Sequence, residues 1–268
     1  MQKLFLTVTT FLLTLAMLAG CSKPQTEQPV VTGPADSATE TTAETTIETT
    51  VETTPAETEE DIVYEGDASS YYIDVVYARQ IERYHTAISQ QWDENAYFEQ
   101  EMSPLAAHYY EGNALDNVGF TFMDLDGDGI WELIIGAIRN AEQDPLVFEI
   151  WALKNDEPVM LVQSGAHNRY YLQYAEEDDL WSVAYEAENG AANHAVYYLQ
   201  LVEGQFQVTQ GILFNAAANE ENPWFMTYDL DWDVSNDTPI DEDTANAVMA
   251  AGRNTYAPQE YFPYSLYK

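Results

Sequence analysis

The chain has 268 residues, of which 46% are hydrophobic and 21% are charged, and its formal net charge at pH 7 is −37. This charge excludes nucleic acid as a partner, because binding to phosphates requires clustered Lys and Arg side chains. A single cysteine excludes an internal disulfide, so stability must come from core packing or from a bound metal.

The first 20 residues have the pattern of a secretory signal peptide. Lys3 precedes an apolar stretch from Leu4 to Leu18, and small residues lead into Cys21. A cleavage site that carries a thiol is typical of a bacterial lipoprotein, and the apolar stretch is too short for a permanent membrane span. We therefore expect the mature chain to begin at Cys21, lipidated on its sulfur. Two acyl chains would anchor it stably to the extracytoplasmic face of the cell membrane.

Residues 21–66 predict a disordered linker. Glutamates recur every four residues from Glu40 to Glu52, within Thr-rich repeats. That spacing would suit a helix, but Thr is a poor helix former, like charges four residues apart repel, and an apolar face is missing. We expect a flexible acidic spacer between the membrane and a folded domain at 67–268. That domain holds 35 acidic and 7 basic residues, a net charge of −28.

The start of the folded domain has the period and the end signals of helices. Apolar residues recur at helical spacing from Ile73 to Trp92. Further on, Ser103 is an expected N-cap and Pro104 an expected first helical residue. We expect three helices: a long one over about 70–91, a short one over 94–101, and one that begins after Ser103 and ends before Gly112.

Beyond Val118 the hydrophobic period becomes two, which indicates strands. Asn155-Asp156 and Glu203-Gly204 are typical of hairpin turns, so neighbouring strands should be antiparallel. A short helix is expected near 241–252. The candidate strands are 118–123, 132–138, 146–154, 158–164, 169–174, 180–186, 195–202 and 205–213.

This order of elements predicts an α+β domain. The N-terminal helices should pack on a single antiparallel meander of about eight strands, followed by the short C-terminal helix. A closed propeller is excluded, because it needs at least four blades of about four strands each.

Residues 124–132 form a motif of candidate metal ligands. Asp124, Asp126 and Asp128 alternate, so a curled loop can direct all three carboxylates to one centre. Glycines between and after them permit the positive φ values that such a curl needs. The carbonyl of Ile130 and the carboxylate of Glu132 would complete a set of hard oxygen ligands, which Ca²⁺ prefers.

An EF-hand is excluded, because its twelfth position requires an acid and here holds Ile135, and because the following residues indicate a strand instead of a helix. The segment therefore predicts one weak calcium site in a loop between two strands. The alternative is an acidic turn without metal.

A second acidic cluster repeats the spacing of the first. It lacks glycines, with Trp232 and Val234 in their place, so an extended strand with one solvated acidic face is the preferred interpretation over a second metal site. Its members are Asp229, Asp231, Asp233 and Asp237.

The sequence shows no HExxH, G-x-S-x-G or P-loop motif that would indicate a catalytic centre. Aromatic residues on the predicted strands are explained by core packing; the alternative is an exposed platform for sugar rings or a partner protein.

Several segments after the first helix have a sequence pattern in common with a known group of proteins, namely 116–120, 133–136, 168–172, 222–224 and 235–240. In these segments the chain resembles uncharacterised lipoproteins of Gram-positive anaerobic bacteria, and its acidic loop is similar to integrin-type (FG-GAP) calcium loops. The resemblance implies the membrane location and the calcium loop, and it implies no activity.

Together these features predict a lipid-anchored cell-surface protein with a calcium-stabilised, non-catalytic module that binds a surface protein or a carbohydrate. The alternative is an extracytoplasmic enzyme that uses acids near the loop to act on an envelope polysaccharide or peptide. Ligand capture for a transporter is disfavoured, because a two-lobed α/β pattern is absent from the sequence.

Overall fold

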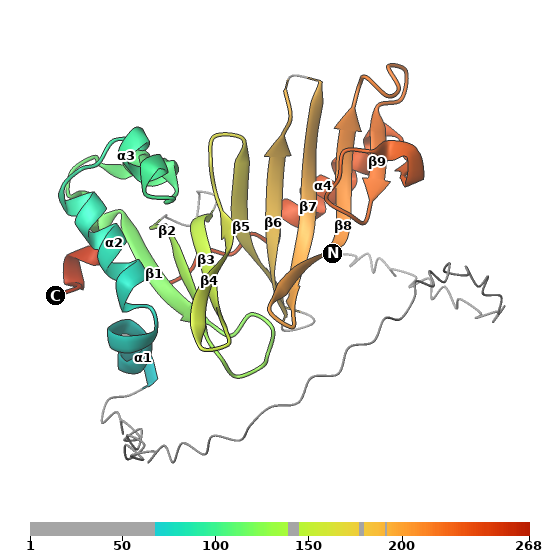
Figure 1. The fold of residues 1–268 in the computed structure, drawn as a ribbon. Helices are drawn as coiled ribbons and strands as arrows, with labels where there is room; N and C mark the ends of the chain where they lie inside the picture. Colours follow the sequence, from blue (N-terminus) through green and yellow to red (C-terminus); the bar gives the residue numbers. More distant parts are fainter. Residues whose placement is uncertain (1–67, 139–144, 177–179, 191) are drawn as a thin grey trace, which may run out of the picture. The chain divides into compact units, whose positions relative to one another are not determined.

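The computed structural model describes most of the predicted folded domain, namely residues 68–138, 145–176, 180–190 and 192–268 (Figure 1). The expected signal peptide, Cys21 and the linker lie outside the described residues. None of the described helices is long and apolar enough to cross a membrane.

The expected long N-terminal helix is interrupted. It consists of α1 (Ala68–Tyr71), a π-helical turn η1 (Tyr72–Val76) and α2 (Ala78–Ser89). The break lies at Tyr77, where φ is −111° and ψ is 14°. There the N–H of Tyr77 donates to the carbonyl of Tyr72 five residues earlier, at 2.9 Å.

Contact with the sheet explains this interruption. The π-helical hydrogen bond between Tyr77 and Tyr72 places the rings of these two residues one above the other, with centroids 6.0 Å apart. The buried hydroxyl of Tyr77 donates to the carbonyl of Trp131 at 3.0 Å, and the ring of Tyr72 stacks on the ring of Trp131. Tertiary packing therefore overrides the regular helical period that the sequence indicates.

The next helical segments are shorter than expected. The second predicted helix is α3 (Glu94–Glu99), and the third is a 3₁₀ helix, η2 (Pro104–Tyr109), followed by η3 (Ala114–Asp116). Ser103 is the N-cap residue and Pro104 the first helical residue, as predicted, but the Ser103 side chain makes no capping bond. Its hydroxyl instead donates to the buried carbonyl of Ser164 at 2.8 Å.

The strands form one open antiparallel sheet, which confirms the predicted α+β class. Its order is β10-β9-β8-β7-β6-β5-β3-β2-β1-β11, and β4 pairs with β3 beside that path. The strands are β1 (Val118–Met123), β2 (Glu132–Ala137), β3 (Leu146–Lys154), β4 (Glu157–Gln163), β5 (Asn168–Ala175), β6 (Leu180–Glu188), β7 (Asn193–Val202), β8 (Gln205–Asn215), β9 (Trp224–Thr227), β10 (Thr238–Pro239) and β11 (Phe262–Pro263).

The eight predicted strands correspond to β1–β8, and the sheet gains three short strands that the sequence did not indicate. Two of them, β10 and β11, have only two residues each, too few to show a period of two. They exist because neighbouring strands offer backbone partners: β11 pairs with β1, and β10 pairs with β9.

Both faces of the sheet are packed. On one face Leu133 and Ile135 of β2 join the core beneath α2, whereas the alternating Ile134 faces a second core. The first core extends toward α4 (Glu242–Arg253), where the hydroxyl of Tyr198 donates to the carbonyl of Val248 at 3.3 Å. Figure 1 shows α2 beside β1 and α4 near β7 and β8.

A buried carboxylate joins the N-terminal helices to the sheet. Glu149 of β3 is 1% exposed and accepts hydrogen bonds from the hydroxyl of Tyr84 at 2.7 Å and the N–H of Ser103 at 2.9 Å. The indole of Trp151 and the amide of Gln163 also donate to it, at 2.8 and 3.3 Å. These donors compensate the cost of burying a charge, so they hold α2, η2 and β4 in position around β3.

Candidate metal centre

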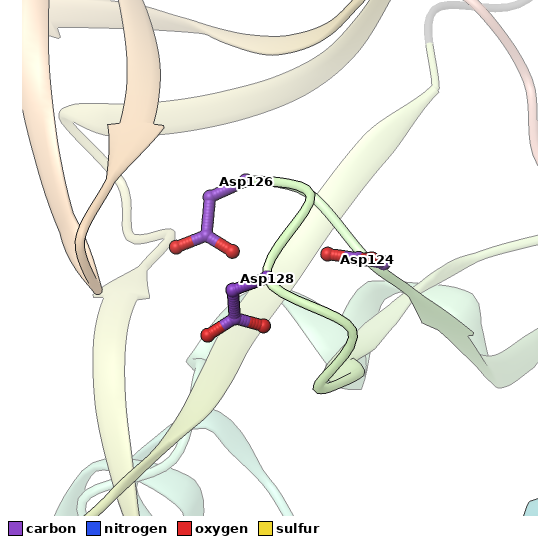
Figure 2. Close-up of side chains that lie close together, drawn as sticks. All are labelled: Asp124, Asp126 and Asp128. Carbon is purple, nitrogen blue, oxygen red and sulfur yellow. The ribbon is translucent and has the colours of Figure 1, made fainter.

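The three alternating aspartates come together in the loop between β1 and β2. Carboxylate oxygens of Asp124, Asp126 and Asp128 lie within 4.8 Å of one another, and Figure 2 shows Asp126 and Asp128 projecting to the same side of the loop. The ends of the loop are held by the antiparallel pair Met123 and Glu132. The two strands therefore fix where the loop begins and ends, and the carboxylates converge between those points.

Glycines and hydrogen bonds curl this loop. Gly127 and Gly129 have φ values of 75° and 86°, the left-handed conformation that the sequence predicts there. The N–H groups of both glycines donate to the two oxygens of Asp124, at 2.8 and 3.0 Å. The N–H of Ile130 donates to Asp128 at 2.7 Å. The curl is therefore built into the protein chain itself.

Asp126 connects the loop to a distant part of the sheet. Its Oδ2 accepts the N–H of Gly204, in the turn between β7 and β8, at 3.2 Å. Its Oδ1 is buried, and none of the described residues donates to that oxygen. A buried carboxylate oxygen without a donor is costly, and repulsion from two neighbouring carboxylates adds to the cost. A bound cation would compensate both costs, so the donor set fits a hard divalent ion such as Ca²⁺.

The roles of Glu132 and of the Ile130 backbone carbonyl as ligands stay predictions. Glu132 stands in β2, 3% exposed, and its Oε2 accepts the N–H of Leu125 at 2.8 Å. It is not among the three residues whose oxygens converge. Burial, together with repulsion from the three nearby aspartates and opposed by the bond from Leu125, raises the pKa of Glu132 to about 7. The side chain of Ile130 is exposed, and its N–H is bonded to Asp128.

The second acidic cluster has a different geometry. Oδ1 of Asp229 accepts the N–H of Asp231 at 3.3 Å, and Oδ1 of Asp231 accepts the N–H of Asp233 at 2.8 Å. The segment bends at these positions and continues as a 3₁₀ turn, η4 (Val234–Asn236), so the preferred prediction of an extended strand is wrong. Asp229, Asp231 and Asp233 each accept the backbone N–H two residues later instead, as Asp and Asn side chains commonly do in turns.

Apolar side chains anchor this second segment. Trp232 and Val234 pack against the second core of the sheet. Burial raises the pKa of Asp237, and repulsion from Asp229 and Asp231 adds to that effect. In the described part of the molecule the acids of this segment are not brought together in the way that those of the first loop are.

The contact between the loop and Gly204 was not predicted. The two residues that make it are 78 positions apart, and a glycine after a glutamate indicates only a hairpin turn. Sequence patterns describe local periods and turns, so they do not reveal which turn lies beside the aspartate loop.

No protein-family model, curated protein or solved structure matches this chain. Function must therefore be argued from the site itself.

Proposed function

We propose that this protein is a lipid-anchored cell-surface protein whose folded domain is a calcium-stabilised, non-catalytic binding module. The observation that supports the metal is the convergence of three aspartate carboxylates, one of which has a buried oxygen that receives no hydrogen bond from the described residues. Carboxylate and carbonyl oxygens suit Ca²⁺, and extracellular calcium-binding modules bind it with a Kd of roughly 10⁻⁴–10⁻³ M.

In this proposal calcium has a structural role. A cation among the three aspartates would neutralise their mutual repulsion. It would also stiffen Asp126, which holds the turn at Gly204 through its other oxygen. Calcium would thereby link the β1–β2 loop to the β7–β8 turn, two parts of the sheet that are far apart in sequence.

The alternative enzyme is less well supported by the site. An acid catalyst needs a raised pKa and access to substrate. Glu132 at the loop has the raised pKa, but it is 3% exposed and bonded to Leu125. Asp124 and Asp128 are engaged in bonds that shape the loop. Release of reducing ends or free amino groups from envelope polymers by the purified protein would favour the enzyme instead.

Calorimetric titration of the full-length protein in detergent with CaCl₂ tests the proposed metal. We expect heat with a stoichiometry near one, and its loss in an Asp124→Asn/Asp128→Asn double variant. The matched control is Asp229→Asn/Asp233→Asn, which removes the same charge from the segment whose acids do not converge. Absence of heat with the wild-type protein at millimolar Ca²⁺, or equal loss in both double variants, would contradict the proposal.

A further inference from the structure

We infer that a cavity beside the aspartate loop binds a neutral sugar ring. This inference rests on the proposed function, because it gives the binding module a ligand class and a site. The cavity has a volume of about 380 Å³ and is lined by three turns that are separate in sequence. Asp128 comes from the β1–β2 loop, Lys154 and Asn155 from the β3–β4 hairpin, and Glu203 from the β7–β8 turn.

The turns around the cavity are tightly constructed. Asn155 and the residue after it have φ values of 53° and 63°, and Glu203 and Gly204 have values of 51° and 70°. Such pairs form two-residue hairpin turns that match the twist of their strands. The bond from Gly204 to Asp126 then fixes one turn against the loop. The walls of the cavity are therefore largely formed before a ligand arrives, which lowers the entropic cost of binding.

Glu203 adopts a conformation that its residue type disfavours. A left-handed residue other than Gly, Asn or Asp costs on the order of 1 kcal/mol. Strain of this kind persists where surrounding structure requires it and is frequent at ligand sites. Here it places a glutamate at the wall of the cavity, where an asparagine would form the same turn with less strain.

The polar lining matches hydroxyl groups. Asp128 and Glu203 are acceptors, Lys154 is a donor, and the amides of Asn155 and Gln205 can do both. A sugar hydroxyl donates and accepts at once, so such a mixed set suits a polyol. An anionic ligand would face two carboxylates and one ammonium, on a domain whose net charge is −28. The lining therefore favours a neutral saccharide.

The apolar lining and the size of the cavity agree with this ligand. Aliphatic side chains on β3 and β4, among them Val159 and Leu161, supply a surface for the C–H face of a sugar ring. The volume is at the lower end of the range of roughly 300–1,000 Å³ that is usual for ligand sites, which suits one or two rings. Asp128 belongs to both the aspartate group and the cavity wall, so calcium there would adjoin the ligand.

Binding of the full-length protein in detergent to an array of neutral and acidic oligosaccharides, at millimolar Ca²⁺, tests this inference. We expect binding to neutral glycans that weakens at least about tenfold in Val159→Trp, which fills the cavity, and in Gln205→Ala, which removes a polar contact. Val75→Trp is the matched control, because Val75 is also exposed and does not line the cavity. The heat of calcium binding, measured in parallel by calorimetry, should be unchanged in all three variants.

The outcomes separate this site from the proposed metal. If calorimetry shows calcium binding but the protein binds no neutral glycan, the sugar site is overturned and the metal site stands. If neutral glycans bind and the Val159 and Gln205 variants weaken that binding, the sugar site is supported. If calorimetry at the same time shows no heat of calcium binding, the proposed metal site is overturned. Binding to acidic glycans alone, or equal weakening by Val75→Trp and Val159→Trp, would overturn the sugar site.

Discussion

At the scale of single residues, two carboxylate groups show how surroundings decide the role of an acid. Glu149 is buried with four hydrogen-bond donors around it and needs no cation. Asp126 has a buried oxygen for which the described residues supply no donor. The first arrangement is complete within the protein, whereas the second suits an added positive charge.

Asp126→Asn should abolish most of the stabilisation by calcium. At a Ca²⁺ concentration of 100 Kd we expect the wild-type protein to gain about 2.7 kcal/mol, equivalent to roughly 5–10 °C in Tm for a domain of this size. The variant should gain less than about 1 kcal/mol, because an amide lacks the charge that calcium requires. Differential scanning calorimetry with and without Ca²⁺ measures the stabilisation of the wild-type protein and of the variant. Asp229→Asn is the control, and an equal calcium-induced shift in the Asp126 variant would contradict the assignment.

Substitution of Glu149 should destabilise the domain in a graded way. Glu149→Gln keeps the shape but weakens charge-assisted bonds, and we expect a loss of about 1–2 kcal/mol. Glu149→Leu removes the acceptor of the buried Tyr84 hydroxyl and of the Trp151 indole, and it leaves the N–H of Ser103 only its longer bond to the Tyr84 oxygen, at a cost of at least about 3 kcal/mol. Urea unfolding followed by Trp fluorescence gives these values. Glu157→Gln, on an exposed residue of β4, should change little; equal effects of all three would refute the network.

At the scale of elements, backbone conformation determines the shape of the aspartate loop. Both glycines of the loop have left-handed φ values, and no atom of the described residues beyond the chain neighbours lies within 4 Å of where a Cβ would be. The requirement for glycine there is therefore conformational and not steric. The same distinction separates this loop from the second acidic segment, which has Trp232 and Val234 at the corresponding positions and packs them against the core.

Gly129→Ala should destabilise the loop by about 1 kcal/mol and weaken calcium binding, because a Cβ disfavours a φ of 86°. Gly165→Ala is a matched control: that glycine also has open space around it, and its φ lies outside the left-handed range. Chemical denaturation and calcium calorimetry of the two variants provide the comparison. Unchanged calcium affinity in Gly129→Ala would show that the curl is not needed for binding.

At the scale of the whole molecule, the proposed anchor and the charge of the folded domain act together. A domain with a net charge of −28 is repelled by an anionic membrane surface. A lipid on Cys21 and an acidic spacer would hold such a domain near the membrane while keeping it away from the lipid headgroups.

Cys21→Ala should release the protein from the membrane. Without the thiol no lipid can be attached, and the two acyl chains that stable anchoring requires are lost. Fractionation of expressing cells, together with metabolic labelling by a fatty-acid analogue, would detect both effects. Persistence of the variant in the membrane fraction, or absence of label in the wild-type protein, would contradict the proposed anchor.

The sequence by itself determined the features that depend on neighbours along the chain. The period of two located β1–β8, the period of 3.6 located α2, and the spacing of three aspartates with two glycines located the loop. These features follow from local backbone preferences and from which side chains share a face, so they can be read without knowing the fold.

Only the tertiary structure decided what those elements contact. The break at Tyr77 depends on the carbonyl of Trp131, and the bonds of Ser103 depend on Glu149 and Ser164. The position of the β7–β8 turn beside the aspartate loop depends on the order of the sheet. Long-range contacts of this kind compensate buried polar groups with partners far away in sequence, and no local period encodes which partner that will be.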